Sequence, residues 1–169
     1  MTKSYRLSLA VAACLASDCG VVQALRDRTF STSRASQAKS IPVTRVAQPS
    51  INLDSDGHPL SVVVRFYKLR DINRFAELTY LQIQRDDRKL LEEDLVATND
   101  VSLLPGATTR VAEVINEGTQ FLGVVAFFRA PSQDKTWKLV IPVERQGESA
   151  AVTILAAGNE VKRVDASQR

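Results

Sequence analysis

Three side chains that can bind metals or polar partners alternate along one short segment of the chain: Asp54, Asp56 and His58. Alternating aspartates are typical of calcium loops, but such a loop also requires a glutamate that does not follow here. His58 is the only histidine, whereas a metal site needs several ligands. We therefore expect neither a metal site nor a cofactor, and we interpret the segment as an exposed polar turn.

Lipid attachment is the second chemistry that the sequence offers. Lys3 and Arg6 precede a short apolar run, and Val11-Ala12-Ala13-Cys14 then fits a lipobox, in which small residues precede a cysteine whose thiol takes a diacylglycerol. Cys14 is the expected site. Cys19 is the alternative: it gives a leader of more usual length but places Asp18 at the cleavage position. Neither cysteine is followed by Asp within two residues, so the inner-membrane retention signal is absent.

Catalytic and nucleic-acid functions find little support in the remaining polar residues. The acidic runs Asp86-Asp87 and Glu92-Glu93-Asp94 could pair as acid and base, but adjacent basic residues make them typical of solvated faces. No nucleophile motif or phosphate-binding glycine loop is present. The run Arg65-Phe66-Tyr67-Lys68 interleaves cations with aromatics, as in single-strand binders, but an export leader argues against that function. We expect no enzyme and no nucleic-acid partner.

Length and charge allow one domain behind a leader. The chain has 169 residues, of which 44% are hydrophobic and 24% are charged, as in ordinary folded domains. Between Gly20 and Val46 there are five basic residues and one acid, Asp27. This excess of positive charge suits a tether beside an anionic membrane surface, and it equally suits a solvated linker.

The polar turn must be positioned by the strand that follows it. Residues 61–69 are rich in β-branched and aromatic side chains. Val62, Val64 and Phe66 would point to one face, and Val63, Arg65, Tyr67 and Leu69 to the other. A strand with apolar residues on both faces needs cover on both.

The other elements predict an all-β architecture, an antiparallel β-sandwich with a short helical insertion. A helix is expected from Asp71 to about Gln84, with apolar residues at helical spacing: Ile72, Phe75, Ala76, Tyr80 and Ile83. Strands, or an irregular crossing in the second and third ranges, are expected at 41–51, 90–97, 101–104, 108–115, 121–129, 137–143 and 151–155. The expected domains are a signal and lipobox region (1–19), a tether (20–39), the sandwich (40–160) and a flexible C-terminus (161–169).

The order of several segments resembles the TssJ family (also called VasD or SciN-type), the outer-membrane lipoproteins of type VI secretion systems. The segments are Leu53-Asp54-Ser55-Asp56-Gly57-His58-Pro59 leading into the strand 62–69, Asp94-Leu95-Val96, Leu104-Pro105-Gly106, and 121–129 with Trp137. The Cys19-Gly20 pair also matches the usual mature start of that family. The chain departs from the family at Leu78-Thr79-Tyr80-Leu81 in the helix.

The resemblance implies a transthyretin-like sandwich, anchored by acyl chains in the outer membrane and facing the periplasm. It also implies that the loop between the first two strands binds the periplasmic domain of the inner-membrane protein TssM. In this chain the loop is Asn52, Leu53, Asp54, Ser55, Asp56, Gly57, His58, Pro59 and Leu60. The alternative is a periplasmic module that binds a small ligand or carbohydrate, which would require exposed aromatics in one cleft; the polar-tipped candidates outside the leader are Tyr67, Tyr80 and Trp137.

Overall fold

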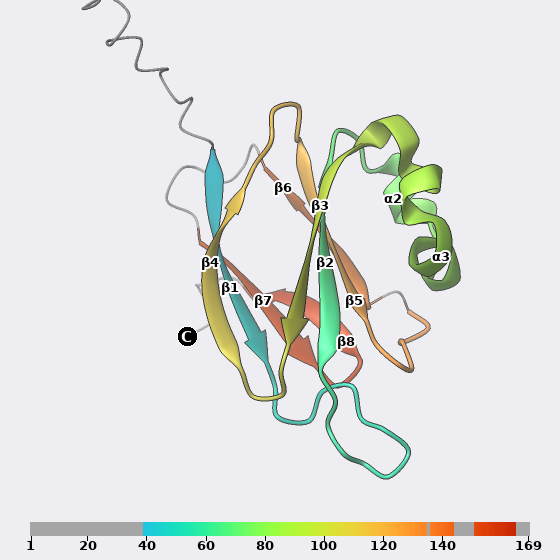
Figure 1. Ribbon diagram of the computed structural model, residues 1–169, viewed down its shortest axis with the longest axis vertical. Helices are drawn as coiled ribbons and strands as arrows, with labels where there is room; N and C mark the ends of the chain where they lie inside the picture. The colour runs from blue at the N-terminus through green and yellow to red at the C-terminus, as the bar shows by residue number, and fades with distance from the viewer. Residues whose placement is uncertain (1–38, 135, 144–150, 165–169) are drawn as a thin grey trace, which may run out of the picture. The chain divides into compact units, whose positions relative to one another are not determined.

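The chain folds into two four-stranded sheets packed as a sandwich (Figure 1), in a computed structural model that describes residues 39–134, 136–143 and 151–164. One sheet has the order β4-β1-β7-β8, formed by Thr108–Val114, Ser40–Ala47, Val152–Ala157 and Glu160–Val164. The other has the order β3-β2-β5-β6, formed by Leu95–Leu103, Val62–Leu69, Phe121–Phe127 and Lys138–Pro142. The predicted all-β sandwich with a helical insertion is confirmed.

Strand direction differs from the prediction at one pair. Among the described strands, β1 and β7 run parallel, with Val43 opposite Val152 and Ala47 opposite Ala156. The other described pairs are antiparallel. Neighbouring strands of a sandwich are often distant in sequence, so the pattern of each strand does not reveal the direction of its partner.

Strand β2 lies at the centre of the second sheet and has the two faces that its sequence predicts. Val64 and Phe66 are fully buried between the sheets, and Tyr67 and Leu69 are fully buried on the opposite face. The cover on that second face comes from the two helices, which lie beside the sheet in Figure 1. Phe75 packs against Tyr67 there, with ring centroids 5.4 Å apart.

The helical insertion consists of two helices, not the single helix predicted over 71–84. They are α2 (Asn73–Glu77) and α3 (Tyr80–Leu91), and a 3-10 turn, η1 (Glu92–Asp94), follows. Helix α3 therefore occupies part of the range predicted as a strand at 90–97, and β3 begins only at Leu95. Of the residues expected on the buried face, Phe75 and Ile83 are fully buried, whereas Ala76 is exposed.

The break between the helices has a local cause. Thr79 begins α3 with a capping box, in which the Thr79 hydroxyl accepts from the Gln82 N–H and the Gln82 side chain accepts from the Thr79 N–H. Leu78 leaves the helical conformation at ψ 131°. The carbonyl groups freed at the end of α2 are satisfied by Lys138 Nζ, which donates at 2.8–2.9 Å to the carbonyl oxygens of Phe75, Ala76 and Leu78.

The C-terminal boundary was also predicted wrongly. Residues 161–164 belong to β8, which pairs with β7, so they do not form part of a flexible end. Val161 is 4% exposed and packs in the core. The turn before β8 uses Gly158, whose φ of 56° lies in the left-handed region that glycine favours. No helix in the described residues is long and apolar enough to cross a membrane.

Candidate functional site: the loop between β1 and β2

Residue Asn52 fixes the base of the loop that joins β1 to β2. Its N–H donates to the Gly158 carbonyl at 2.9 Å, its side-chain amide donates to the Ser61 carbonyl at 2.8 Å, and its side-chain oxygen accepts from the Arg129 N–H at 2.7 Å. Asn52 is 5% exposed and has a φ of 49°, a conformation that asparagine tolerates better than most residues. These three bonds position the base of the loop, and the contact of Asn52 with a partner stays a prediction.

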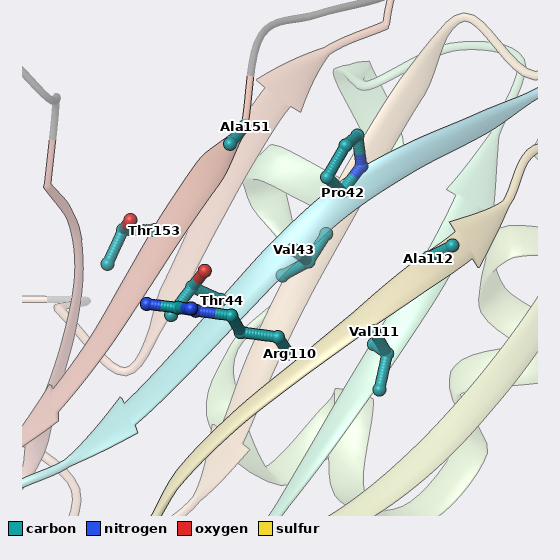
Figure 2. A pocket seen from close by; sticks show the side chains of 8 residues that line it. All are labelled: Pro42, Val43, Thr44, Arg110, Val111, Ala112, Ala151 and Thr153. Atoms are coloured by element: carbon teal, nitrogen blue, oxygen red, sulfur yellow. The ribbon is translucent and has the colours of Figure 1, made fainter.

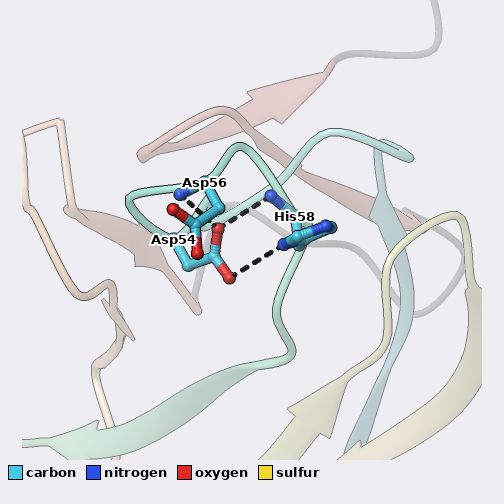
Figure 3. A group of neighbouring side chains, drawn as sticks. All are labelled: Asp54, Asp56 and His58. Atoms are coloured by element: carbon cyan, nitrogen blue, oxygen red, sulfur yellow. Dashed lines mark hydrogen bonds and ion pairs between the residues drawn. The ribbon is translucent and has the colours of Figure 1, made fainter.

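The tip of the loop is shaped by one carboxylate, that of Asp54. Its Oδ1 accepts from the N–H groups of Asp56 and His58 at 2.9 and 2.8 Å (Figure 3). The Asp54 N–H donates to the His58 carbonyl at 2.9 Å, and Gly57 closes the turn with a φ of 83°. These side-chain to backbone bonds form an Asx turn, which holds its shape without help from the core.

Hydrogen bonding also sets the charge state of this tip. The bond from the His58 backbone, followed by that from the Asp56 backbone, outweighs desolvation and holds the pKa of Asp54 below its ordinary value. Arg129 lowers the pKa of Asp54 further by its charge. The carboxylate is therefore ionised at neutral pH, and the tip presents negative charge to the solvent.

Apolar side chains flank the polar tip. Leu53 and Leu60 are 41% and 38% exposed, and the His58 side chain is 74% exposed. Ser55, Asp56, Gly57 and Pro59 are also exposed. The loop therefore presents an exposed polar tip between two exposed leucines.

The same tip brings together the three potential metal ligands of the sequence. In the part of the chain that the structure describes, Asp54, Asp56 and His58 form a group whose ligand atoms lie within 4.8 Å of one another. The geometry follows from the Asx turn: Asp54 Oδ2 lies 3.3 Å from His58 Nδ1, and Oδ1 is taken by two backbone donors. The missing glutamate still argues against a calcium loop.

Two other candidates from the sequence, the run 65–68 and Asp87, make contacts within the protein. Arg65 pairs with Asp100 and with Asp87 at 2.6 and 2.7 Å, while Phe66, Tyr67 and Lys68 are buried, so this run forms no nucleic-acid surface. Asp87 accepts hydrogen bonds from Arg65 and Tyr67 in the interior. The sequence pattern predicted instead that the acidic run containing Asp87 lies on a solvated face.

The polar-tipped aromatics do not gather in an open cleft. Tyr67 is fully buried and donates to Asp87, and Trp137 is 3% exposed with its ring 5.1 Å from that of Tyr80. The Tyr80 hydroxyl donates to the Phe128 carbonyl. These three rings pack inside the protein, so they do not form the exposed aromatic cleft that the carbohydrate-binding alternative requires.

A shallow hollow of about 460 Å³ lies on the outer face of the first sheet (Figure 2). Strands β1, β4 and β7 line it with small side chains, and Arg110 extends across the ribbon of β1 near Thr44 and Thr153. Cys14 and Cys19, the signal and lipobox region expected at 1–19, and the tether expected at 20–39 except for Lys39 lie outside the described residues.

The described residues thus form a two-sheet sandwich with an exposed loop at one end, whose tip is held by its own hydrogen bonds. The family model of the type VI secretion lipoproteins (VasD, EvfM, TssJ) matches residues 39–159, and the chain belongs to this family. The predicted family membership is confirmed.

Solved structures agree with this membership. The chain is similar to a protein of the "Type VI membrane complex", at 31% identity and a TM-score of 0.70, covering 76% of this chain and 99% of the other. It is similar to a chain of the structure described as the T6SS protein TssM C-terminal domain from EAEC, at 31% identity and 0.64, covering 75% and 98%. It also resembles the T6SS lipoprotein TssJ1 from Pseudomonas aeruginosa, at 25% identity and 0.66, covering 75% and 95%. The comparison with curated proteins found no match.

Proposed function

We propose that this protein is the outer-membrane lipoprotein of a type VI secretion membrane complex, and that its β1–β2 loop binds the periplasmic domain of TssM. The family, and the similarity to a chain of a structure described by the TssM C-terminal domain, support the partner. The observation that best supports this site is the Asp54 carboxylate. Its Oδ1 accepts two backbone hydrogen bonds, which fix the tip before any partner arrives. A preformed loop loses little conformational entropy on binding.

In this arrangement the residues of the loop have different roles. Leu53 and Leu60 are the apolar anchors, and Ser55, Asp56, His58 and the backbone around Gly57 and Pro59 are the polar contacts. Asn52 and Asp54 are positioning residues, because their polar groups are already used inside the loop and at its base. The protein acts as a structural connector and catalyses no reaction.

The test replaces residues 54–58 with a Gly/Ser segment of equal length and measures binding to the purified TssM periplasmic domain. We expect binding to be lost while the thermal midpoint changes little, because the tip contributes few contacts to the core. The matched control is Leu81→Ser on α3, where the side chain is 61% exposed. Unchanged binding in the folded loop variant, with loss in the control, would move the site to the helices.

Anchoring requires a separate experiment, since both cysteines lie outside the described residues. We propose acylation at Cys14, with Cys19 as the alternative, followed by the tether and then the sandwich. Cys14→Ala, Cys19→Ala and the double variant are each expressed with labelled fatty acid, and membranes are separated by density. Loss of label in one variant identifies the site, because the thiol of the acylated cysteine is the acceptor of the lipid. Label retained in the double variant, or label confined to inner membranes, would contradict the proposal.

A further inference from the structure

Three charged side chains are buried in the interior of the sandwich, where strands normally place apolar residues. Arg45 on β1, Lys68 on β2 and Glu113 on β4 are 4%, 5% and 3% exposed. Glu113 pairs with Arg45 Nη2 through one oxygen and with Lys68 Nζ at 3.3 Å through the other. Asn99 on β3 donates to Glu113 at 3.3 Å. The cluster thus joins strands of both sheets.

The charges of this cluster do not balance. In the described residues the two cations have ion pairs with one carboxylate, Glu113, which leaves one positive charge in excess. Burial lowers the pKa of Arg45 by more than the Glu113 carboxylate raises it. Buried charge without full compensation is costly, so an additional anion would be stabilised at this position.

Hydrogen-bonding capacity is also unused. Arg45 Nε is buried and has no hydrogen-bond partner, although a buried guanidinium normally donates with all its N–H groups. The Arg45 guanidinium carbon lies 4.7 Å from the centroid of the Phe66 ring, which supports the cation from one side without supplying an acceptor. The cluster therefore contains a buried donor, Arg45 Nε, with no acceptor oxygen beside it.

A cavity gives access to this cluster. It has a volume of about 310 Å³ and is lined by Arg45, Lys68, Asn99, Glu113 and the β4 residues 111, 112 and 114. Val111 lies on the same face of β4 as Glu113 and is 38% exposed, so apolar surface stands beside the buried positive charge. The size is at the lower end for ligand sites, which combine apolar walls with a few polar groups.

We propose that this cavity binds a small monocarboxylate, held by Arg45 and Lys68 with its apolar body against Val111, which lies on the same face of β4 as Glu113. One excess charge matches one carboxylate, and a planar carboxylate accepts well from guanidinium and ammonium groups. A dianion would overcompensate the cluster and would lie close to Glu113. This site is independent of the β1–β2 loop and does not rest on the proposed function.

The test uses the full chain, purified in an uncharged detergent and observed by amide NMR at pH 7 and constant ionic strength. Sodium butyrate is the probe, and butyramide, which has the same shape without the charge, is the control. We expect saturable shifts of the amides of Asn99 and residues 111–114 with butyrate and none with butyramide. Equal shifts with both compounds, or no saturable shift with butyrate, would overturn the proposal.

Two substitutions move the charge balance in opposite directions. Lys68→Met leaves a neutral Arg45–Glu113 pair and is expected to weaken butyrate binding roughly tenfold or more, since a lost charge-assisted bond contributes at that level. Glu113→Gln adds to the excess positive charge and is expected to strengthen binding. Lys68→Gln replaces Lys68→Met if the latter does not fold.

A purely structural cluster would give a different pattern. Both substitutions would then lower the thermal midpoint, and butyrate would bind to neither variant nor to the parent. Inorganic phosphate is titrated in parallel. Phosphate binding as tight as butyrate binding at the same amides would overturn the assignment of a monocarboxylate.

Discussion

The hydroxyl group of Tyr67 on β2 donates a 2.8 Å hydrogen bond to Asp87 Oδ2 on α3, in the interior between the sheet and the helices. The same oxygen accepts from Arg65 Nη1 at 2.7 Å. This one carboxylate therefore fastens the helical insertion to the central strand, and burial is the first cause of the raised pKa of Tyr67.

Removing that carboxylate should loosen the helices. We expect Asp87→Ala to lower the free energy of unfolding by about 1–3 kcal/mol, because the buried Tyr67 hydroxyl loses its acceptor. The control is Asp86→Ala, where the side chain is exposed. Chemical denaturation of both variants measures the difference. Equal effects would show that the hydrogen bond contributes nothing specific.

The base of the β1–β2 loop should depend on Asn52. We expect Asn52→Ala to destabilise the protein by about 1–3 kcal/mol, because the Arg129 N–H loses its acceptor and a φ of 49° strains alanine. Asn52→Gly removes the same bonds without the strain and should cost less. Both variants are compared by thermal unfolding and by TssM binding. Glycine as harmful as alanine would mean that the backbone conformation contributes little.

Acidification should release the tip of the loop before it unfolds the sandwich. The pKa of Asp54 is lower in the folded protein than its ordinary value of 3.8, so its hydrogen bonds stabilise the tip above that pH. This contribution is lost as the pH falls from 3.8 through the folded pKa. The protection factors of the Asp56 and His58 amides against hydrogen exchange, which correct for the intrinsic pH dependence of exchange, measure this loss as a function of pH. Asp54→Asn, which does not titrate, should show a flat profile.

Close packing at Gly123 predicts intolerance of any side chain. A Cβ atom there would lie 2.8 Å from Phe75 Cζ and 3.1 Å from Leu69 Cδ1. We expect Gly123→Ala to cost about 1–3 kcal/mol of stability through overpacking. Adding Phe75→Leu should recover part of the loss by making space under α2. A double variant no better than Gly123→Ala alone would argue against this contact as the cause.

The sequence by itself determined several of the strands and the position of the loop. Apolar and β-branched periodicity placed β2, β4 and β5 close to their observed bounds, because a half-buried strand must alternate its side chains. Turn-forming residues marked the exposed segment 53–60, because Asp, Gly and Pro act on the backbone locally. The capping box at Thr79 was also readable, and overlooking it produced one helix where there are two.

Tertiary structure alone decided the features that depend on distant partners. Arg45 and Glu113 are charged residues of two strands, yet both are buried, because they form an ion pair with each other. Asn52 lies in a polar turn but is buried, since its partners come from Ser61, Arg129 and Gly158. The parallel β1–β7 pair likewise joins segments far apart in the chain. Charge pairing and hydrogen bonding across such separations leave no local pattern, so only the folded chain reveals them.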